Sequence, residues 1–144
     1  LDRSLVARLS LTRSRTTITG DLTIKGQARM IFTAEVADIR RFRSKDAFAR
    51  HNGTAPVPVW SGNRERHRLA RTGNRQLNAA IHRIAITQAR CHPDARAYLD
   101  RRAAMGNNAA EARRALKRRL SDIVYRALLA DAEPVTTGRL AEAA

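Results

Sequence analysis

Apolar residues recur every three or four positions along most of this chain, and this spacing limits the fold more than any other feature of the sequence. An amphipathic helix repeats about every 3.6 residues, whereas a half-buried strand alternates apolar and polar residues. Such alternation is confined to residues 55–60. The pattern therefore predicts a mainly all-α fold, a compact helical domain of about five helices with one extended, proline-rich segment. A chain of 144 residues has room for one such domain with a real core.

Capping residues divide the middle of the chain into separate helices. A helix of about three turns is expected within residues 27–42, ending near Asp38, and Ser44 should cap a short helix over residues 44–51. The next helix is expected over about residues 74–90, with Thr72 or Gly73 as its cap. Its buried stripe is expected to comprise Leu77, Ile81, Ile84 and Gln88.

Two further helices are expected in the last third of the chain. Pro93 opens the first, which runs to about Met105. Asn108 and Glu111, three residues apart, form a capping box for the second and longest helix. The apolar seam of this helix is predicted to be Leu116, Leu120, Ile123, Val124, Ala127 and Leu128, next to a basic collar of Arg113, Arg114, Lys117, Arg118 and Arg119.

The extended segment ends in a serine that has two interpretations. Pro56 and Pro58 exclude a helix, and the segment delivers Ser61 to an expected turn at residues 62–63, which opens an arginine-rich loop. Ser-Gly-Asn is a common turn sequence. A serine beside guanidinium groups could instead attack a phosphodiester, because those groups stabilise the charge that develops on the phosphate. The residue pattern leaves both interpretations open.

The charge of the chain indicates a polyanionic partner. The formal net charge is +15, and all but three of the 28 basic residues are arginine. Arginine offers a planar fork of donors that fits phosphate oxygens, so binding to nucleic acid is expected and should weaken as salt rises. A merely solvated basic surface is the alternative. The predicted DNA- or RNA-binding residues are Arg64, Arg66, Arg68, Arg71, Asn74, Arg75, Asn78 and His82.

Four of these residues form a polar stripe opposite the apolar one. At about 100° per residue, Arg71, Arg75, Asn78 and His82 lie on one side of the expected helix over residues 74–90. Such a stripe is typical of a solvated helix face. Its position beside the arginine-rich loop favours contacts with phosphate equally well.

Several other classes of function are excluded by the composition. One cysteine, Cys91, and four scattered histidines give no zinc-ligand spacing, and no protein metal site is expected. Neither a Walker nor a dinucleotide-binding glycine pattern occurs. No apolar run approaches the length of a membrane span. We therefore expect no membrane partner and a soluble, cytoplasmic protein.

Several strings together carry a family resemblance. In order they are DIRRFRSKDAFARHNGTAPV, SGNRERHRLARTGNRQLNAAIH, TQAR, RAYLDRR and EARRALKRRLSDIVYRALL. They resemble the C-terminal transposase domain of the insertion-sequence one-ten transposase family, over about residues 16–131. By this resemblance residues 1–15 are the end of a coiled-coil arm, whereas the position of residues 132–144 at the end of the chain predicts a frayed tail. Where family members usually carry Ser-Ser-Gly, this chain has Trp60-Ser61-Gly62.

The resemblance implies an activity and several partners. Family members are prokaryotic DNA recombinases guided by a structured RNA, so DNA, guide RNA and a homo-oligomeric parent associated with the nucleoid are expected. Ser61 would be the catalytic nucleophile. Mg²⁺ would be held by an N-terminal ribonuclease-H-like domain that precedes this chain, and the chain alone would be inactive as an enzyme. A non-enzymatic basic helical nucleic-acid-binding protein, or a decayed transposase remnant, remains the alternative.

Overall fold

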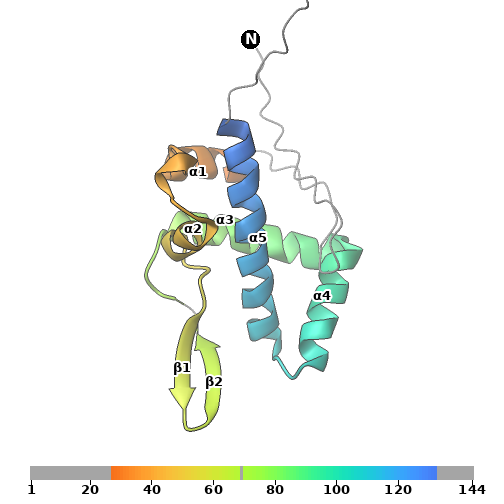
Figure 1. Cartoon of the computed structure of the whole chain (residues 1–144). Coiled ribbons are helices and arrows are strands. Elements are labelled where there is room, and N and C mark those ends of the chain that lie inside the picture. The colour runs from red at the N-terminus through yellow and green to blue at the C-terminus, as the bar shows by residue number, and fades with distance from the viewer. Residues whose placement is uncertain (1–26, 69, 133–144) are drawn as a thin grey trace, which may run out of the picture.

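A computed structural model describes residues 27–68 and 70–132, which form a mainly α-helical domain with one small hairpin (Figure 1). The expected arm, residues 1–15, and residues 133–144 of the expected tail lie outside the described residues. The elements in chain order are α1 (Gln27–Val36), the 3₁₀ turn η1 (Ile39–Arg41), α2 (Lys45–His51), β1 (Val57–Ser61), β2 (Arg64–Arg68), α3 (Arg75–Cys91), α4 (Pro93–Ala104) and α5 (Ala109–Ala132). The predicted fold class is confirmed.

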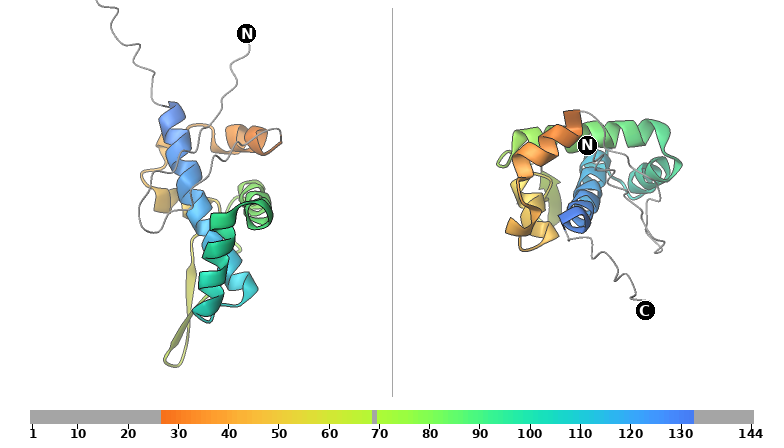
Figure 2. Two further views of the ribbon diagram at one scale, coloured as in Figure 1. Left: turned by 90° about the vertical axis from the view of Figure 1, so that its right-hand side faces the viewer. Right: turned by 90° about the horizontal axis from the view of Figure 1, so that it is seen from above.

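The long helix α5 is the centre of the domain. It packs against α2, α3, α4 and η1. Figure 2 shows α5 end on in its right-hand view, with α3 crossing behind it and with α2 and α4 on opposite sides. The hairpin leaves the body of the molecule beside the first turns of α5 and projects past them.

The core forms where the apolar stripes of α3 and α5 meet. Leu77 and Ile81 of α3 and Leu116 of α5 are fully buried, as is Phe48 of α2. Burying each such side chain contributes roughly 1.5–3 kcal/mol. The predicted stripe and seam are confirmed, since their apolar members are either in the core or, like Leu128, packed against it, and Gln88 is also buried.

Capping groups fix the helix ends, mostly as the sequence predicts. The Ser44 hydroxyl accepts from the Ala47 amide at 3.2 Å. Asn108 and Glu111 form the expected capping box, in which each side chain accepts from the other residue's amide at 2.9 Å. The expected cap of α3 is wrong. Asn74 caps this helix, because its side chain accepts from the Leu77 amide at 3.0 Å.

The expected arginine-rich loop contains a second strand. β2 pairs antiparallel with β1, from Val57 opposite Arg68 to Ser61 opposite Arg64. The turn between them is the one expected at residues 62–63, and Gly62 takes a φ of 60° there. The sequence of β2, RERHR, has no apolar residue, so apolar alternation could not reveal it.

A close contact between two glycines places the hairpin on the helical body. Gly73 precedes the cap of α3 and has a φ of 129°. A Cβ atom there would lie 2.9 Å from both the Gly53 nitrogen and the His51 carbonyl oxygen, at the end of α2. The next residue, Asn74, donates its amide to that same carbonyl at 2.6 Å. Only glycine allows this approach of the two backbones.

We expect Gly73→Ala to destabilise the domain more than Gly106→Ala. Both positions have positive φ, but nothing lies within 4 Å of a Cβ atom at Gly106. Alanine should therefore cost about 1–2 kcal/mol of backbone strain at Gly106. At Gly73, the collision of the new Cβ atom with the backbones of Gly53 and His51 should add at least about 1 kcal/mol. Urea denaturation followed by circular dichroism measures both, and equal losses would contradict the assigned contact.

Candidate nucleic-acid interface

The register of the hairpin places Ser61 on an arginine face. Side chains of directly paired residues point to the same face of an antiparallel ribbon, and successive residues alternate between faces. Ser61 therefore shares one face with Arg66 and Arg68, which pair with Val59 and Val57. The same register sets Arg64 opposite Ser61. The predicted serine and three of the predicted binding arginines are thus brought together on one short hairpin.

The other face of the hairpin carries different chemistry. Trp60 pairs with Glu65, and His67 pairs with Pro58. Trp60 is 69% exposed. His67 Nε2 lies 3.6 Å from Glu65 Oε1. Because His67 is on the face opposite Ser61, the hairpin's own histidine is not placed to accept the serine proton.

Two predicted binding residues have structural roles in this fold. Besides capping α3, the Asn74 amide donates to a carboxylate oxygen of Glu35. The side chain of Asn78 donates to the Asn52 backbone carbonyl at 2.9 Å and accepts from Lys117 Nζ at 2.7 Å. A nucleic-acid contact by either amide stays a prediction. Both amides are already engaged within the protein.

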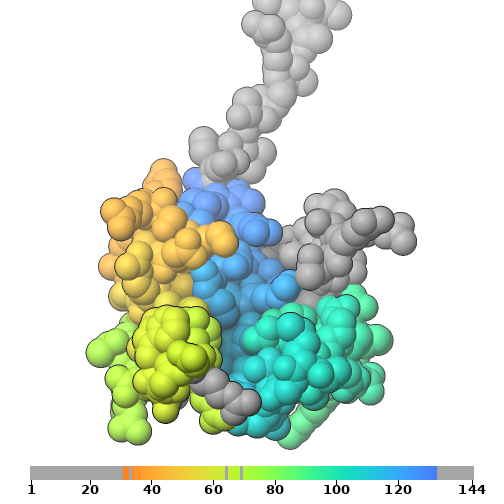
Figure 3. Space-filling model, turned by 60° about the horizontal axis from the view of Figure 1, so that its bottom comes forward, coloured from red at the N-terminus to blue at the C-terminus, as the bar shows by residue number. Residues whose placement is uncertain are grey.

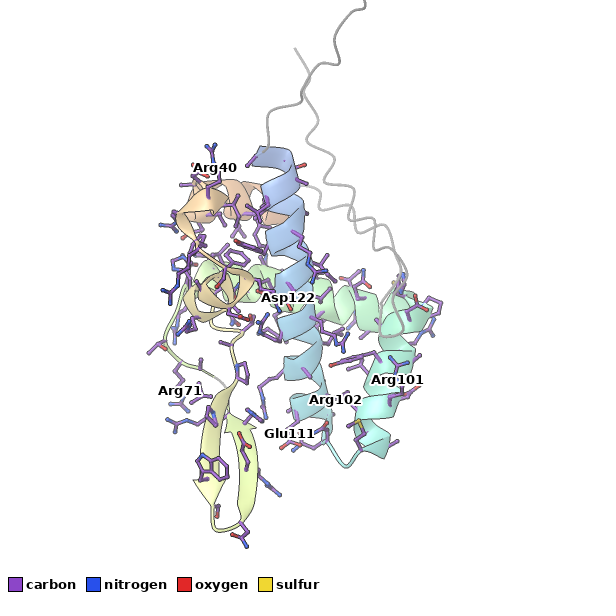
Figure 4. All side chains as sticks on the ribbon, in the orientation of Figure 1. Arg40, Arg71, Arg101, Arg102, Glu111 and Asp122 are labelled. Carbon is purple, nitrogen blue, oxygen red and sulfur yellow. The ribbon has the colours of Figure 1, made fainter. Side chains whose placement is uncertain are left out.

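The remaining predicted residues lie at the start of α3 and beside it. Arg75 is the first residue of α3 and is exposed. Arg71 precedes the helix and lies beside the base of the hairpin (Figure 4), so it is not part of the helical stripe. His82 lies on α3 and is largely exposed. Partial desolvation of its ring lowers its pKa, and the positive charges of Lys117 and Arg113 lower it further. The predicted stripe is thus split between a loop and a helix.

A cavity of about 780 Å³ between β2, α4 and α5 did not emerge from the sequence. Figure 3 shows the hairpin, α5 and α4 side by side on the face where it lies. Its carboxylates are Glu65 and Glu111. Its basic side chains are Arg66, Arg68, Arg102, Arg114, Lys117, Arg118 and Arg119. The basic collar of α5 was visible as a pattern, but its partners across the cavity come from distant segments.

Some of these basic groups hold the fold together. Arg118 forms ion pairs with Asp46 of α2 and Asp122 of α5. Arg114 donates to the backbone carbonyl of His67 at 3.3 Å and so connects α5 to β2. The guanidinium of Arg119 lies 4.7 Å from the centre of the Tyr98 ring. These contacts build the cavity wall.

Two donors at the cavity are less well satisfied. Lys117 is only 7% exposed, and burial lowers the pKa of its ammonium group. Its hydrogen-bond partner, Asn78, is a neutral amide. Arg102 lies between α4 and α5 (Figure 4), and its Nε is buried with no hydrogen-bond partner among the described residues. Such groups are costly in a folded protein unless a ligand uses them.

Metal and membrane sites are not found in the described part of the chain. Residues 27–68 and 70–132 contain no group of three His, Cys, Asp or Glu side chains that could hold a metal ion. No helix in these ranges is long and apolar enough to cross a membrane.

The buried Lys117 predicts a pH-dependent stability. Because its pKa is lowered in the folded state, the unfolded chain binds this proton more firmly between neutral pH and the ordinary lysine value near 10.5. The free energy of unfolding of the wild type should therefore rise with pH in this range, relative to that of Lys117→Met. Chemical denaturation across this pH range measures the difference. Lys45→Met controls for the general loss of one positive charge, and a flat or falling difference would contradict the assigned burial.

Comparison with known proteins identifies the family of this chain. The sequence matches the family described as Transposase IS116/IS110/IS902 family over residues 22–100, more than half of the 144 residues. The match spans the hairpin and α3 and ends within α4. No curated protein matches the sequence. Since a transposase acts on DNA, this match implies DNA as a partner. The chain belongs to the Transposase IS116/IS110/IS902 family.

Proposed function

We propose that this chain is the DNA-binding part of the transposase and that Ser61 is the nucleophile for DNA strand cleavage and exchange. The observation that carries the proposal is the hairpin register, which sets Ser61 on the same face as Arg66 and Arg68. The hairpin also projects from the helical body, so that this face is accessible to a duplex (Figure 1). Ser61 and both arginines are exposed.

The chemistry of this face suits attack on a phosphodiester. The Ser61 oxygen forms a bond to phosphorus while the bond from phosphorus to one sugar oxygen breaks, and that sugar oxygen leaves as a hydroxyl group. The neighbouring guanidinium groups stabilise the extra negative charge on the phosphorus centre. The serine proton needs an acceptor, and His67 lies on the opposite face. We therefore infer that the base comes from outside this hairpin.

The missing base is consistent with a site that is completed by a second domain. No carboxylate cluster in the described ranges could hold a metal. We propose that Mg²⁺ belongs to a ribonuclease-H-like domain of the full-length transposase, and that this chain alone does not exchange strands. A structured guide RNA, a homo-oligomer and association with the nucleoid belong to the same proposal. Their support is the family resemblance.

Ser61→Ala in the full-length transposase should abolish the covalent protein–DNA intermediate. The change removes one exposed oxygen atom and should leave DNA binding unchanged, which a binding assay on the same preparation checks. Denaturing gel electrophoresis with labelled DNA measures the covalent adduct. Asn63→Ala, an exposed turn residue two positions away, should retain the adduct.

Equal adduct formation by Ser61→Ala and the wild type would remove Ser61 from this role. Absence of any adduct from the wild type would instead favour the non-enzymatic binding protein or the decayed remnant. A combined Trp60→Ser and Ser61→Ala variant tests the neighbouring position, where family members usually carry a second serine. Recovery of the adduct in this variant would show that a serine at position 60 can also act as the nucleophile.

The hairpin arginines should account for part of the salt dependence of DNA binding. Each phosphate contact contributes about 0.9 to the slope of log affinity against log salt. The double variant Arg66→Gln, Arg68→Gln should therefore have a slope shallower by about two. The control is Arg90→Gln with Arg126→Gln, two exposed arginines far from the hairpin on α3 and α5. Fluorescence anisotropy measures both slopes, and identical slopes would contradict DNA binding by this face.

A further inference from the structure

We propose that the cavity between β2, α4 and α5 binds a phosphate group of an unpaired nucleic-acid strand. This site is distinct from Ser61, and it would operate whether or not Ser61 is a nucleophile. It rests on the proposed function only in that the strand belongs to the nucleic acid that the chain binds. Its main ligands are Lys117 of α5 and Arg102 of α4.

The charge lining the cavity is strongly positive. Seven basic side chains face two carboxylates, Glu65 and Glu111. Glu111 accepts from the Asn108 amide at 2.9 Å in the capping box, and this hydrogen bond is the largest cause of the lowered pKa of its carboxyl group. The Glu111 carboxylate therefore stays ionised, and it caps the N-terminus of α5. An anionic ligand would offset the remaining positive charge.

Lys117 is the strongest single indication of a ligand. An ammonium group has three N–H donors. One of them is directed to Asn78 Oδ1 at 2.7 Å, while the side chain as a whole is 7% exposed. Burying a charge against a neutral amide is unfavourable for the free energy of folding. A phosphate in the cavity would supply the missing negative charge and accept from the remaining donors.

Arg102 provides a second, independent indication from the opposite wall. Its Nε is buried and has no hydrogen-bond partner among the described residues. The guanidinium group binds phosphate oxygens through paired donors. Because Nε itself is buried, a phosphate seated between α4 and α5 would accept from the terminal nitrogens of this guanidinium group and from Lys117. Arg102 belongs to α4 and Lys117 to α5, so the two observations are independent of each other.

The depth of the site favours an unpaired strand over a duplex. The phosphates of a duplex lie on a stiff, convex surface and cannot follow a cavity down to a side chain that is 93% buried, the complement of its 7% exposure. An unpaired nucleotide can turn into a cavity of about 780 Å³, which is within the usual range for small ligands. Met105, which is 74% exposed and lines the cavity, offers an apolar contact for its base.

The test compares probes and variants of the whole chain at near-physiological salt. Binding of a short single-stranded oligonucleotide should weaken about tenfold or more in Lys117→Met, since a charge-assisted hydrogen bond is worth about 1.5–3 kcal/mol. Binding of a duplex of the same sequence should change by less than about twofold. Lys45→Met, which alters an exposed lysine on α2, should leave both unchanged. Arg102→Gln should also weaken single-strand binding and leave duplex binding unchanged, and it alters a side chain that is only partly buried. Circular dichroism checks that each variant is folded.

The outcomes separate this inference from the proposed function. Unchanged single-strand binding in a folded Lys117→Met or Arg102→Gln would overturn the inference, as would equal losses for single strand and duplex. Displacement of the single strand by millimolar inorganic phosphate, with the duplex retained, would support it. Inorganic phosphate binding as tightly as the oligonucleotide would show a free-phosphate site and overturn the nucleic-acid assignment. Failure of the wild type to bind any nucleic acid would instead contradict the proposed function.

Discussion

Two side-chain amides, those of Asn52 and Asn78, hold the arrangement on which the rest of this domain depends. Asn52 is fully buried at the end of α2, and its amide donates to the Ser121 hydroxyl of α5 at 2.8 Å. Asn78 of α3 donates to the Asn52 carbonyl and accepts from Lys117 of α5. The chain of contacts ties three helices together in a region where each polar group would otherwise be buried without a partner. It also holds the ammonium group of Lys117, a residue that lines the cavity.

The basic residues divide into groups with different physical roles. Arg118 is committed to two carboxylates, and Arg114 links α5 to the hairpin. The Arg114 contact connects β2 to α5, even though no described side chain of the hairpin belongs to the core. The exposed arginines of the hairpin remain accessible. A protein with a net charge of +15 thus uses part of its charge for its own fold and leaves another part exposed at the surface.

The helices and most of their ends could be predicted from the sequence because their signals are local. The stripe containing Leu77 and the capping box of Asn108 both lie within a few residues of chain. β2 could not be predicted in this way, since its pairing depends on backbone hydrogen bonds to β1 and its side chains are all polar. The cavity could not be predicted either, because Arg102 and Lys117 line the same cavity only when α4 packs against α5. Ser61 was identifiable as a candidate from sequence, whereas its shared face with two arginines required the register.

The hairpin and the adjoining cavity together make up the proposed nucleic-acid interface. The most direct test is an NMR titration of the uniformly ¹⁵N-labelled chain with a duplex and then with a single strand. The account predicts that the duplex shifts the amide signals of residues 57–68, and that the single strand also shifts signals around Arg102 and Lys117. Signals of α1 and of the last turns of α5 should stay unchanged. Shifts concentrated at those distant elements, with the hairpin unaffected, would contradict the account.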